Sequence, residues 1–571
     1  MKSLHKLLIH FTALLFALFA CLNPAHAEPT AADQAEDFRF KTIYFLLPDR
    51  FNLYGTAYVD PQYPDASNPV NCFQAACETE QEFRSYWGGN VQGVIQKLDY
   101  LHKVGISAVW LGPMMQNVPG YDPEGWGTGY HGYWVDNVYN VNPYFGQWSD
   151  IDQLSSALHQ HGMRYIQDIT LNHSNPSDSH VHGLLYGVNN TQVVASYQDD
   201  DSQFYKHFEG DSRCIEAQQI PDSQWDYWQL HHCLLAKLSG YNQDNPATAN
   251  YLNEGYKVWL THGVDGLRED AVKFVFPDFV ARFNHMVDDY ARSRGRPAPY
   301  IVGEWSNGGV SDLKSLAYAN SYSRFLSNIL DFQLSFALNR YVGGSYEPTS
   351  QYITAAQLGE FLDQRVAAFH GRDTWQGSFI DNHDQVRTLV RLQKLNVQDE
   401  AERKRRMDLA TVLLMTVRGV PIIYYGDEQY LAHYNDHATI PPDDINSSND
   451  DPYNRVGMKT WNQNTSAFRI IRTLAQLRKT SPAIALGDYR TLYADDNILV
   501  FLRSHQNDRV LVAVNRGISK TITLPEPMPV ANGQYSNLLQ NSGTNEINRC
   551  TVSDQHVELE LDAQSAMVLR F

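Results

Sequence analysis

Residues 266–274 read GLREDAVKF, a short stretch in which Arg268 and Asp270 stand two positions apart. Alternate residues of an extended chain point to the same side, so these two side chains share one face of a predicted strand. Similar runs, separated by helical periodicity, occur at 42–47, 107–112, 164–171, 300–304, 328–332, 378–381 and 420–425. Eight strands that alternate with helices predict an α/β fold, the (β/α)8 TIM barrel.

The barrel pattern is expected over 28–173 and 243–484. Between these parts, residues 174–242 form an overlong connection after the third strand, rich in Asp, Gln, Tyr and His and without sustained periodicity. Such a connection predicts an inserted, loop-rich B domain with a functional role. From 485 to 571, short alternating strands predict a C-terminal antiparallel β-sandwich domain.

The start of the chain predicts export. Lys2 and Lys6, followed by an apolar run and an Ala-His-Ala motif, are typical of a signal peptide, here over 1–27. The protein is therefore expected to be secreted or periplasmic, and a lipoprotein cleavage site at Cys21 is the less favoured alternative. No later stretch has the ~18 apolar residues of a membrane helix, so no membrane is expected for the mature chain.

Charge narrows the choice of partners. The chain has 64 acidic and 45 basic residues and a formal charge of −19, which disfavours nucleic acid and anionic membranes. Aromatic residues make up 12% of the chain, which suits sugar rings but also suits an ordinary large core. Oligomeric state is not readable from the sequence, and a monomer is assumed.

Five of the six cysteines follow residue 27. In an exported chain, near neighbours in sequence are the natural disulfide pairs, here Cys72 with Cys77 and Cys214 with Cys233. Cys550 is left over. A buried thiol is its expected state, because no His/Asn arrangement surrounds it.

Three carboxylates stand at the carboxyl ends of predicted strands, where barrels carry their chemistry: Asp270, Glu304 and Asp384. Glycosidic cleavage requires one ionised and one protonated carboxyl group. Arg268 would keep Asp270 ionised, and Asp384 would raise the pKa of Glu304. Each carboxylate alone fits an ordinary ion-paired residue, but three at the ends of barrel strands, with His383 beside them, favour catalysis.

The segments DITLNH, GLREDAVKF, VGEW and FIDNHD resemble, in order and spacing, the four signature regions of glycoside hydrolase family 13, the α-amylase family. Nearly the whole mature chain is similar to bacterial α-amylases and cyclodextrin glucanotransferases, through YWGGNVQGVIQKLDYL, GYHGYW, YNQDNP, GVPIIYYGDEQY, DPYNR and LRKTSPAIALG. The resemblance implies Asp270 as nucleophile, Glu304 as general acid/base and Asp384 as transition-state stabiliser.

The resemblance also implies substrate-binding residues. They are Tyr133, His131, His173, Arg268, Lys273, His383, Asp451 and Arg455. Tyr133 would stack on the sugar in the cleaved subsite, while Arg268 would orient the nucleophile. Asp451 and Arg455 would hold sugars on the non-reducing side, and Lys273 would bind beyond the cleavage point.

Some positions depart from the family pattern. Phe274 stands where most members have His, and Glu269 replaces an apolar residue whose side chain should face the surrounding helices. The family calcium site would use Asn172, the backbone carbonyl of Phe274 and an Asp, but aligning Asn242 in YNQDNP puts Gly240 at that Asp. Calcium needs about six to eight oxygen ligands, some of them charged. The resemblance therefore implies a calcium cofactor whose site is incomplete. Asn172 is its one transferable side-chain ligand.

The sequence thus predicts a secreted α-amylase, a retaining endo-hydrolase of α-1,4-glucosidic bonds in starch, glycogen or maltooligosaccharides. An α-glucanotransferase, similar to cyclodextrin glucanotransferases, is the alternative, and a non-catalytic glucan-binding protein is the third interpretation. Cyclising members carry a bulky aromatic residue where this chain has Ala236, and append a starch-binding module that does not follow the β domain here. Both features favour hydrolysis.

Overall fold

A computed structural model of the chain describes residues 36–571 except for 62–69, 71, 74–78, 123–125, 178–181, 200–202, 322–325, 344–351, 396, 398, 433–451 and 541–547. The predicted signal peptide and the alternative lipoprotein site at Cys21 therefore lie outside the described residues. Cys77 and Asp451 also lie outside them.

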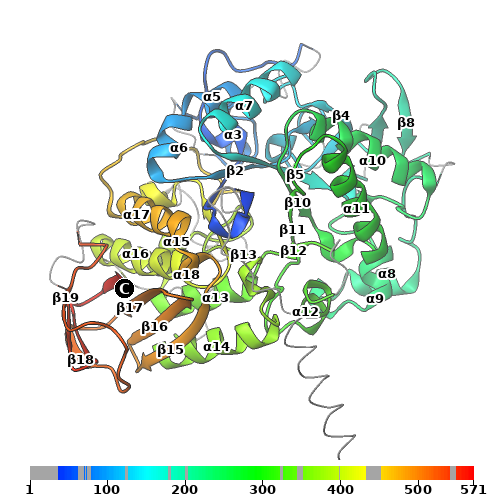
Figure 1. The fold of residues 1–571 in the computed structure, drawn as a ribbon. Coiled ribbons are helices and arrows are strands. Elements are labelled where there is room, and N and C mark those ends of the chain that lie inside the picture. Colours follow the sequence, from blue (N-terminus) through cyan, green and yellow to red (C-terminus); the bar gives the residue numbers. More distant parts are fainter. Residues whose placement is uncertain are drawn as a thin grey trace, which may run out of the picture.

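Eight parallel strands form a nearly closed barrel in the centre of the molecule (Figure 1). In chain order they are β1 (Ile43–Leu46), β2 (Ala108–Leu111), β5 (Arg164–Thr170), β10 (Gly266–Asp270), β11 (Tyr300–Gly303), β12 (Asn328–Ile329), β13 (Gly377–Ser378) and β14 (Val420–Tyr424). β1 pairs with β14, and a single parallel bridge between Leu330 and Gly377 links β12 to β13. The predicted barrel is confirmed.

The barrel strands are short. They are apolar because helices cover their outer face and side chains fill the inside of the barrel. All residues of β1 and β14 are buried, as parallel strands require. The strand predicted over 328–332 stops early, because the carboxylate of Asp331 accepts a hydrogen bond from the backbone N–H of Leu334 (3.0 Å) and so caps the next helix.

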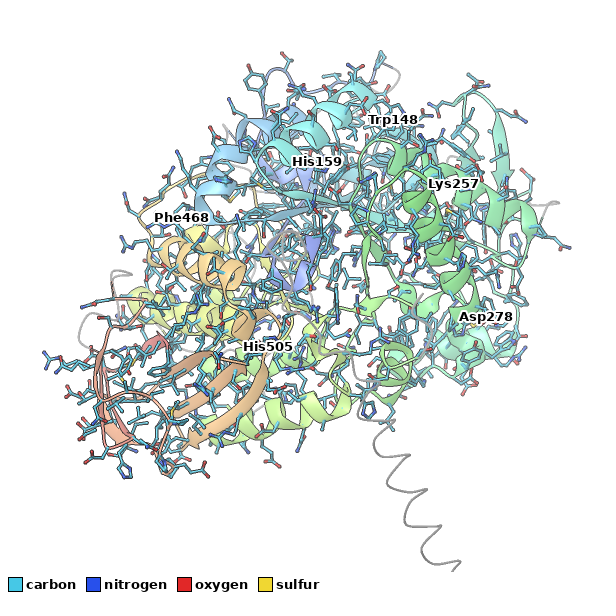
Figure 2. All side chains as sticks on the ribbon, in the orientation of Figure 1. Trp148, His159, Lys257, Asp278, Phe468 and His505 are labelled. Atoms are coloured by element: carbon cyan, nitrogen blue, oxygen red, sulfur yellow. A yellow bond between two sulfur atoms is a disulfide. The ribbon has the colours of Figure 1, made fainter. Side chains whose placement is uncertain are left out.

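Helices carried by the strand connections cover the barrel. They are α3 (Pro48–Phe51), α4 (Glu80–Phe83), α5 (Val91–Gln96), α6 (Leu98–Val104), α7 (Trp148–Gln160), α10 (Pro246–Thr261), α11 (Pro277–Ser293), α12 (Leu313–Ala319), α13 (Phe332–Val342), α14 (Ala355–Ala368), α15 (Thr388–Lys394), α16 (Glu400–Thr416), α17 (Ser466–Thr480) and α18 (Pro482–Ala485). Polar residues such as His159 of α7 and Asp278 of α11 lie on the outer surface of this layer (Figure 2). No helix of the described chain combines the length and apolar character needed to span a bilayer.

Two further regions between β2 and β10 consist of short strands and helices. A hairpin of β3 (Met115–Asn117) and β4 (Val135–Val141) precedes α7. After β5, the inserted segment contains β6 (His173–Pro176), β7 (Leu184–Tyr186), β8 (Val193–Ser196), α8 (Ser212–Ala217), α9 (Tyr227–His232) and β9 (Leu238–Gly240). β6 pairs with β9, which brings the two ends of the segment together at the barrel rim.

Two disulfides were predicted in this half of the chain. Cys214 and Cys233 form a disulfide that joins α8 to the end of α9, at the lower right of Figure 1. Cys72 is also disulfide-bonded, while its predicted partner Cys77 lies outside the described residues.

The C-terminal part of the chain forms two four-stranded antiparallel sheets, drawn in orange to red in Figure 1. One contains β15 (Asp488–Ala494), β16 (Ile498–His505), β17 (Asp508–Asn515) and β22 (Ser565–Arg570), and the other β18 (Lys520–Thr523), β19 (Gly533–Tyr535), β20 (Arg549–Ser553) and β21 (His556–Leu561). Residues of both sheets, such as Val500 and Leu559, share one apolar core with the thiol of Cys550, whose pKa burial raises to about 12. The predicted β-sandwich is confirmed.

Candidate active site

The carboxyl ends of the barrel strands open into a cavity of about 1060 Å³. Asp270 ends β10, Glu304 follows β11 directly, and Asp384 stands in the loop after β13. All three line the cavity, so the structure brings the predicted carboxylates together at one mouth of the barrel.

Arg268 contacts two of these carboxylates, Asp270 and Glu304. Its side chain is fully buried, and Nη1 donates to Oδ1 of Asp270 (2.6 Å). Nη2 lies 2.9 Å from Oε2 of Glu304. A planar guanidinium can address two carboxylates at once, which a lysine ammonium does less well. Arg268 was predicted to orient Asp270, and the structure adds a direct contact with Glu304.

Glu304 is a buried acid with a pKa raised to about 8. Burial is the main cause, because it penalises the charged form; Arg268 opposes the shift, and the charges of Asp270 and Asp384 add to it. The direction matches the sequence-based expectation, but burial contributes more than Asp384, the cause expected there. At neutral pH the Glu304 carboxyl therefore carries a proton.

Asp384 lies in a more open position, with 40% of its side chain exposed. Nη2 of Arg455 lies 2.9 Å from its Oδ1, and Nε2 of His383 lies 3.1 Å from its Oδ2. Arg455 also donates to the hydroxyl of Tyr130 (3.1 Å), which sequence analysis did not single out. Arg455 thus supports Asp384 directly, while Asp451, its predicted partner in sugar binding, lies outside the described residues.

One tyrosine and three histidines also line the cavity. Tyr133 stacks on His383, with ring centroids 5.1 Å apart and an interplanar angle of 7°. The backbone N–H of Tyr133 donates to Nδ1 of His131 (3.0 Å), and Nε2 of His173 lies 3.8 Å from Asp270. Burial lowers the pKa of all three histidines. They are therefore neutral at pH 7 and present hydrogen-bonding groups without added charge.

Asp168 is a buried member of this cluster that sequence analysis did not single out. Its Oδ1 accepts from Arg268 (2.9 Å), and its Oδ2 accepts from the hydroxyl of Tyr133 (2.8 Å) and from the indole of Trp110 (3.1 Å). Burial raises its pKa to about 7. The sequence signal was its place at the start of the DITLNH segment, whereas its pairing with Arg268 follows from the β5–β10 register that only the structure shows.

Lys273 and Phe274 contact the inserted segment; Phe274 lines the cavity, whereas Lys273 is buried and is not among the residues that line it. Nζ of Lys273 forms an ion pair with Oδ2 of Asp222 (3.0 Å). The ring of Phe274 lines the cavity and packs edge-on against Trp225, with centroids 5.7 Å apart. Both residues are therefore engaged by the inserted segment.

Glu269 lies on the opposite face of β10 from Arg268 and Asp270. Its carboxyl group is fully buried and accepts a hydrogen bond from the hydroxyl of Ser327. Burial raises its pKa to about 7. Ser327 thus supplies a hydrogen-bond donor to the buried Glu269 carboxyl group, which faces the helices.

The residues at the expected calcium position do not fit the ion. Gly240 supplies no carboxylate, and the place its Cβ would take lies 3.1 Å from Cδ2 of Leu234 and 3.7 Å from Cδ of Lys206, which is buried. An added side chain would press against Leu234 and contact the aliphatic part of Lys206, and neither residue offers an oxygen ligand. In the part of the chain that the structure describes, no three His, Cys, Asp or Glu residues are grouped to hold a metal ion. Asn172 alone makes no calcium site.

The chain resembles known proteins along nearly its whole length. The family model for the α-amylase catalytic domain matches residues 45–467, and that for the α-amylase C-terminal all-β domain matches residues 492–571. A cyclomaltodextrin glucanotransferase of Klebsiella oxytoca is 34% identical, covering 97% of this chain and 81% of that protein. An α-amylase of Niallia circulans is 28% identical, covering 93% of this chain and 91% of that protein.

A solved structure shows the same architecture. CldA, described as the first cyclomaltodextrin glucanotransferase with a three-domain ABC distribution, has a TM-score of 0.77 and 27% identity, covering 93% of this chain and 99% of that chain. The chain therefore belongs to the α-amylase family, glycoside hydrolase family 13, and is a glycoside hydrolase of that family.

Proposed function

We propose that this enzyme is an α-amylase that hydrolyses α-1,4-glucosidic bonds within starch, glycogen or maltooligosaccharides and retains the anomeric configuration. The observation that carries the proposal is the arrangement around Arg268. Its guanidinium lies 2.6 Å from Asp270 and so stabilises a negative charge there, while burial keeps Glu304 protonated with a pKa of about 8. Two carboxyl groups in opposite protonation states are what glycosidic cleavage requires.

In the first step, the carboxylate of Asp270 forms a bond to C1 of the sugar as the C1–O bond to the leaving chain breaks. Glu304 gives its proton to the leaving oxygen. Water then attacks C1 of the glycosyl-enzyme, Glu304 takes a proton from that water, and Asp270 departs with its bonding electrons. Asp384, supported by Arg455, would hold the ring hydroxyls during both steps.

The substrate-binding assignments belong to the same proposal. The residues are Tyr133, His131, His173, Arg268, Lys273, His383, Asp451 and Arg455. The neutral histidines suit hydroxyl groups as partners, because each ring offers one donor and one acceptor. The flat face of Tyr133, already parallel to His383, suits the apolar face of a sugar ring.

A cyclising glucanotransferase is the second candidate, and the names of the Klebsiella oxytoca relative and of CldA favour it. CldA is described as a cyclomaltodextrin glucanotransferase with three domains, so the expectation drawn from the starch-binding module does not favour hydrolysis. The residues that line the cleft favour hydrolysis. Among described residues of 174–242, those that line it are Pro221, Asp222, Leu235, Ala236 and Leu238, and none of these is aromatic. A cyclising enzyme would be expected to present an aromatic side chain there for the glucan to wrap around.

Product analysis separates the two candidates. The purified enzyme is incubated with soluble starch and with maltoheptaose, and the products are resolved by chromatography beside a Glu304→Gln variant. Short linear maltooligosaccharides that vanish with the variant support the amylase. Cyclic or lengthened glucans from the wild type would reject it in favour of the transferase.

Several further assignments are part of this proposal. We expect residues 1–27 to direct export and the mature enzyme to act outside the cytoplasm as a monomer. We also divide the chain into the barrel (28–173 and 243–484), the B domain (174–242) and the β-sandwich (485–571). No step of the proposed cleavage is assigned to calcium.

A further inference from the structure

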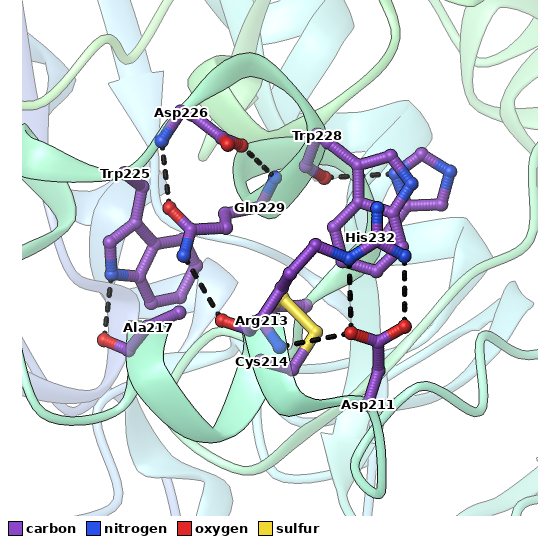
Figure 3. The surroundings of a disulfide bond; sticks show 10 residues. Asp211, Arg213, Cys214, Ala217, Trp225, Asp226, Trp228, Gln229 and His232 are labelled. Atoms are coloured by element: carbon purple, nitrogen blue, oxygen red, sulfur yellow. Dashed lines mark hydrogen bonds and ion pairs between the residues drawn. A yellow bond between two sulfur atoms is a disulfide. The ribbon is translucent and has the colours of Figure 1, made fainter.

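One wall of the cleft comes from the disulfide loop, the segment 214–233 closed by the bond between Cys214 and Cys233 (Figure 3). Pro221 and Asp222 of this loop line the same cavity as Asp270 and Glu304. The disulfide loop therefore faces the space in which the glucan is proposed to be cut.

Contacts inside the disulfide loop hold it in one shape (Figure 3). Nε1 of Trp225 donates to the carbonyl of Ala217 (2.8 Å), and Nε2 of Gln229 donates to the carbonyl of Arg213 (3.0 Å). Trp225 also packs against Phe274 of the barrel. Because these contacts lie on both sides of position 222, they fix where the loop meets the cleft.

Asp222 reaches from this loop to two residues of the barrel. Its Oδ2 lies 3.0 Å from Nζ of Lys273 and accepts a hydrogen bond from Oγ of Ser306 (3.1 Å). Lys273 also donates to Ser306 (3.3 Å) and is itself buried. Asp222 keeps 28% of its side chain exposed, and among the described residues none donates to its Oδ1. That oxygen is available to a ligand in the cleft.

The contact between Asp222 and Ser306 indicates on which side of the scissile bond Asp222 lies. Ser306 stands two residues after Glu304, the group proposed to protonate the leaving oxygen. The leaving oxygen must lie within reach of the Glu304 carboxyl, so the sugar that carries it lies beside Glu304; Ser306 and Asp222 line the same cavity. Asp222 borders the leaving side.

We propose that Asp222 is a specificity-determining residue that accepts hydrogen bonds from hydroxyl groups of the glucose unit on the leaving side. Hydrogen bonds to an ionised carboxylate are among the stronger ones in proteins, and neighbouring sugar hydroxyls are suitable donors. Lys273 and Ser306 act as positioning residues that hold one carboxylate oxygen and leave the other for the sugar. The inference rests on the proposed glucan cleavage.

The test compares two substrates that present different groups on the leaving side of the bond. Maltoheptaose places glucose units there, whereas 2-chloro-4-nitrophenyl maltotrioside, followed by release of the phenol, places none. We expect Asp222→Asn to lower kcat/KM for maltoheptaose about tenfold, mainly through KM, as the loss of a hydrogen bond to a charged acceptor would. For the phenyl maltotrioside we expect a change of less than about twofold.

Asp226→Asn is the matched control. It removes the same charge four residues away in the disulfide loop, where asparagine can still cap α9, and Asp226 is not among the residues that line the cleft. It should leave both substrates unaffected. An equal fall on both substrates for Asp222→Asn, or no fall on either, would overturn the inference while the wild-type activity keeps the proposed function intact. A wild type inactive on both substrates would instead reject the proposed function.

Discussion

The two walls of the cleft hold their charged residues in different ways. On the barrel side, a fully buried guanidinium joins Asp270 to Glu304, and both carboxylates come from neighbouring parallel strands. On the inserted side, Asp222 is partly exposed and reaches the cleft from a loop held by a disulfide. Burial shifts pKa values and so prepares a group for proton transfer, whereas a half-exposed carboxylate serves better for recognition. We therefore expect barrel variants to change turnover and loop variants to change selectivity.

Glu304→Gln should have the largest effect. The amide keeps the shape of the side chain but cannot give a proton to the leaving oxygen, so kcat on maltoheptaose should fall by about 10²–10⁴. The measurement is initial rate with product chromatography. Glu360→Gln, on the exposed surface of α14, is the control and should match the wild type. A Glu304→Gln enzyme within about fivefold of wild type would show that the acid lies elsewhere.

The dependence of kcat/KM on pH should show the titration of the Glu304 carboxyl group. Glu304 acts as an acid only while protonated, so kcat/KM should fall above a pKa of about 8, by about tenfold per pH unit. The negative charge of Asp384 raises this pKa, and its removal in Asp384→Asn should therefore move the alkaline limb to lower pH. An alkaline limb that stays in place, or moves upward, in this variant would contradict the electrostatic link.

The sequence predicted the functional residues of the barrel side of the cleft better than those of the inserted side. The barrel strands repeat as short apolar runs, and polar residues at their ends are local features, so Asp270, Glu304 and Asp384 could be proposed from pattern and resemblance. Asp168 was missed because its role depends on the register between β5 and β10. Asp222 was missed because its partner Lys273 is 51 positions away in the chain and the insertion has no periodicity.

The calcium prediction shows the same limit. Sequence alignment showed only that Gly240 lacks a carboxylate, whereas the structure shows that Leu234 and Lys206 pack close to it. Lys206 comes from a part of the chain well before Gly240, and such a contact leaves no local pattern in the sequence. The same reason explains why Ser327 could not be named as the partner of Glu269.

Opening the disulfide loop should have a smaller and more selective effect. In a double variant Cys214→Ala and Cys233→Ala, Asp222 is held less firmly, so KM for maltoheptaose should rise by about three- to fivefold. Release of the phenol from 2-chloro-4-nitrophenyl maltotrioside should stay within about twofold, and circular dichroism shows whether the fold is kept. If a folded double variant loses both activities equally, the loop supports the catalytic carboxylates and the contrast between the walls fails.

Removal of divalent cations should have the smallest effect. Because the expected calcium position lacks its carboxylate, treatment with a chelator should change Tm by less than about 1 °C and leave activity unchanged. Differential scanning calorimetry with and without added calcium measures this. A fall in Tm that calcium restores would show that the ion binds despite Gly240.

The most direct test of the account identifies the residue that bonds to the sugar. A fluorinated maltosyl donor slows hydrolysis of the glycosyl-enzyme, and mass spectrometry of peptides from the trapped protein locates the added sugar. The account predicts a single label on the peptide that contains Asp270. A label on the peptide that contains Asp384, or a product of inverted configuration with no trapped enzyme, would contradict it.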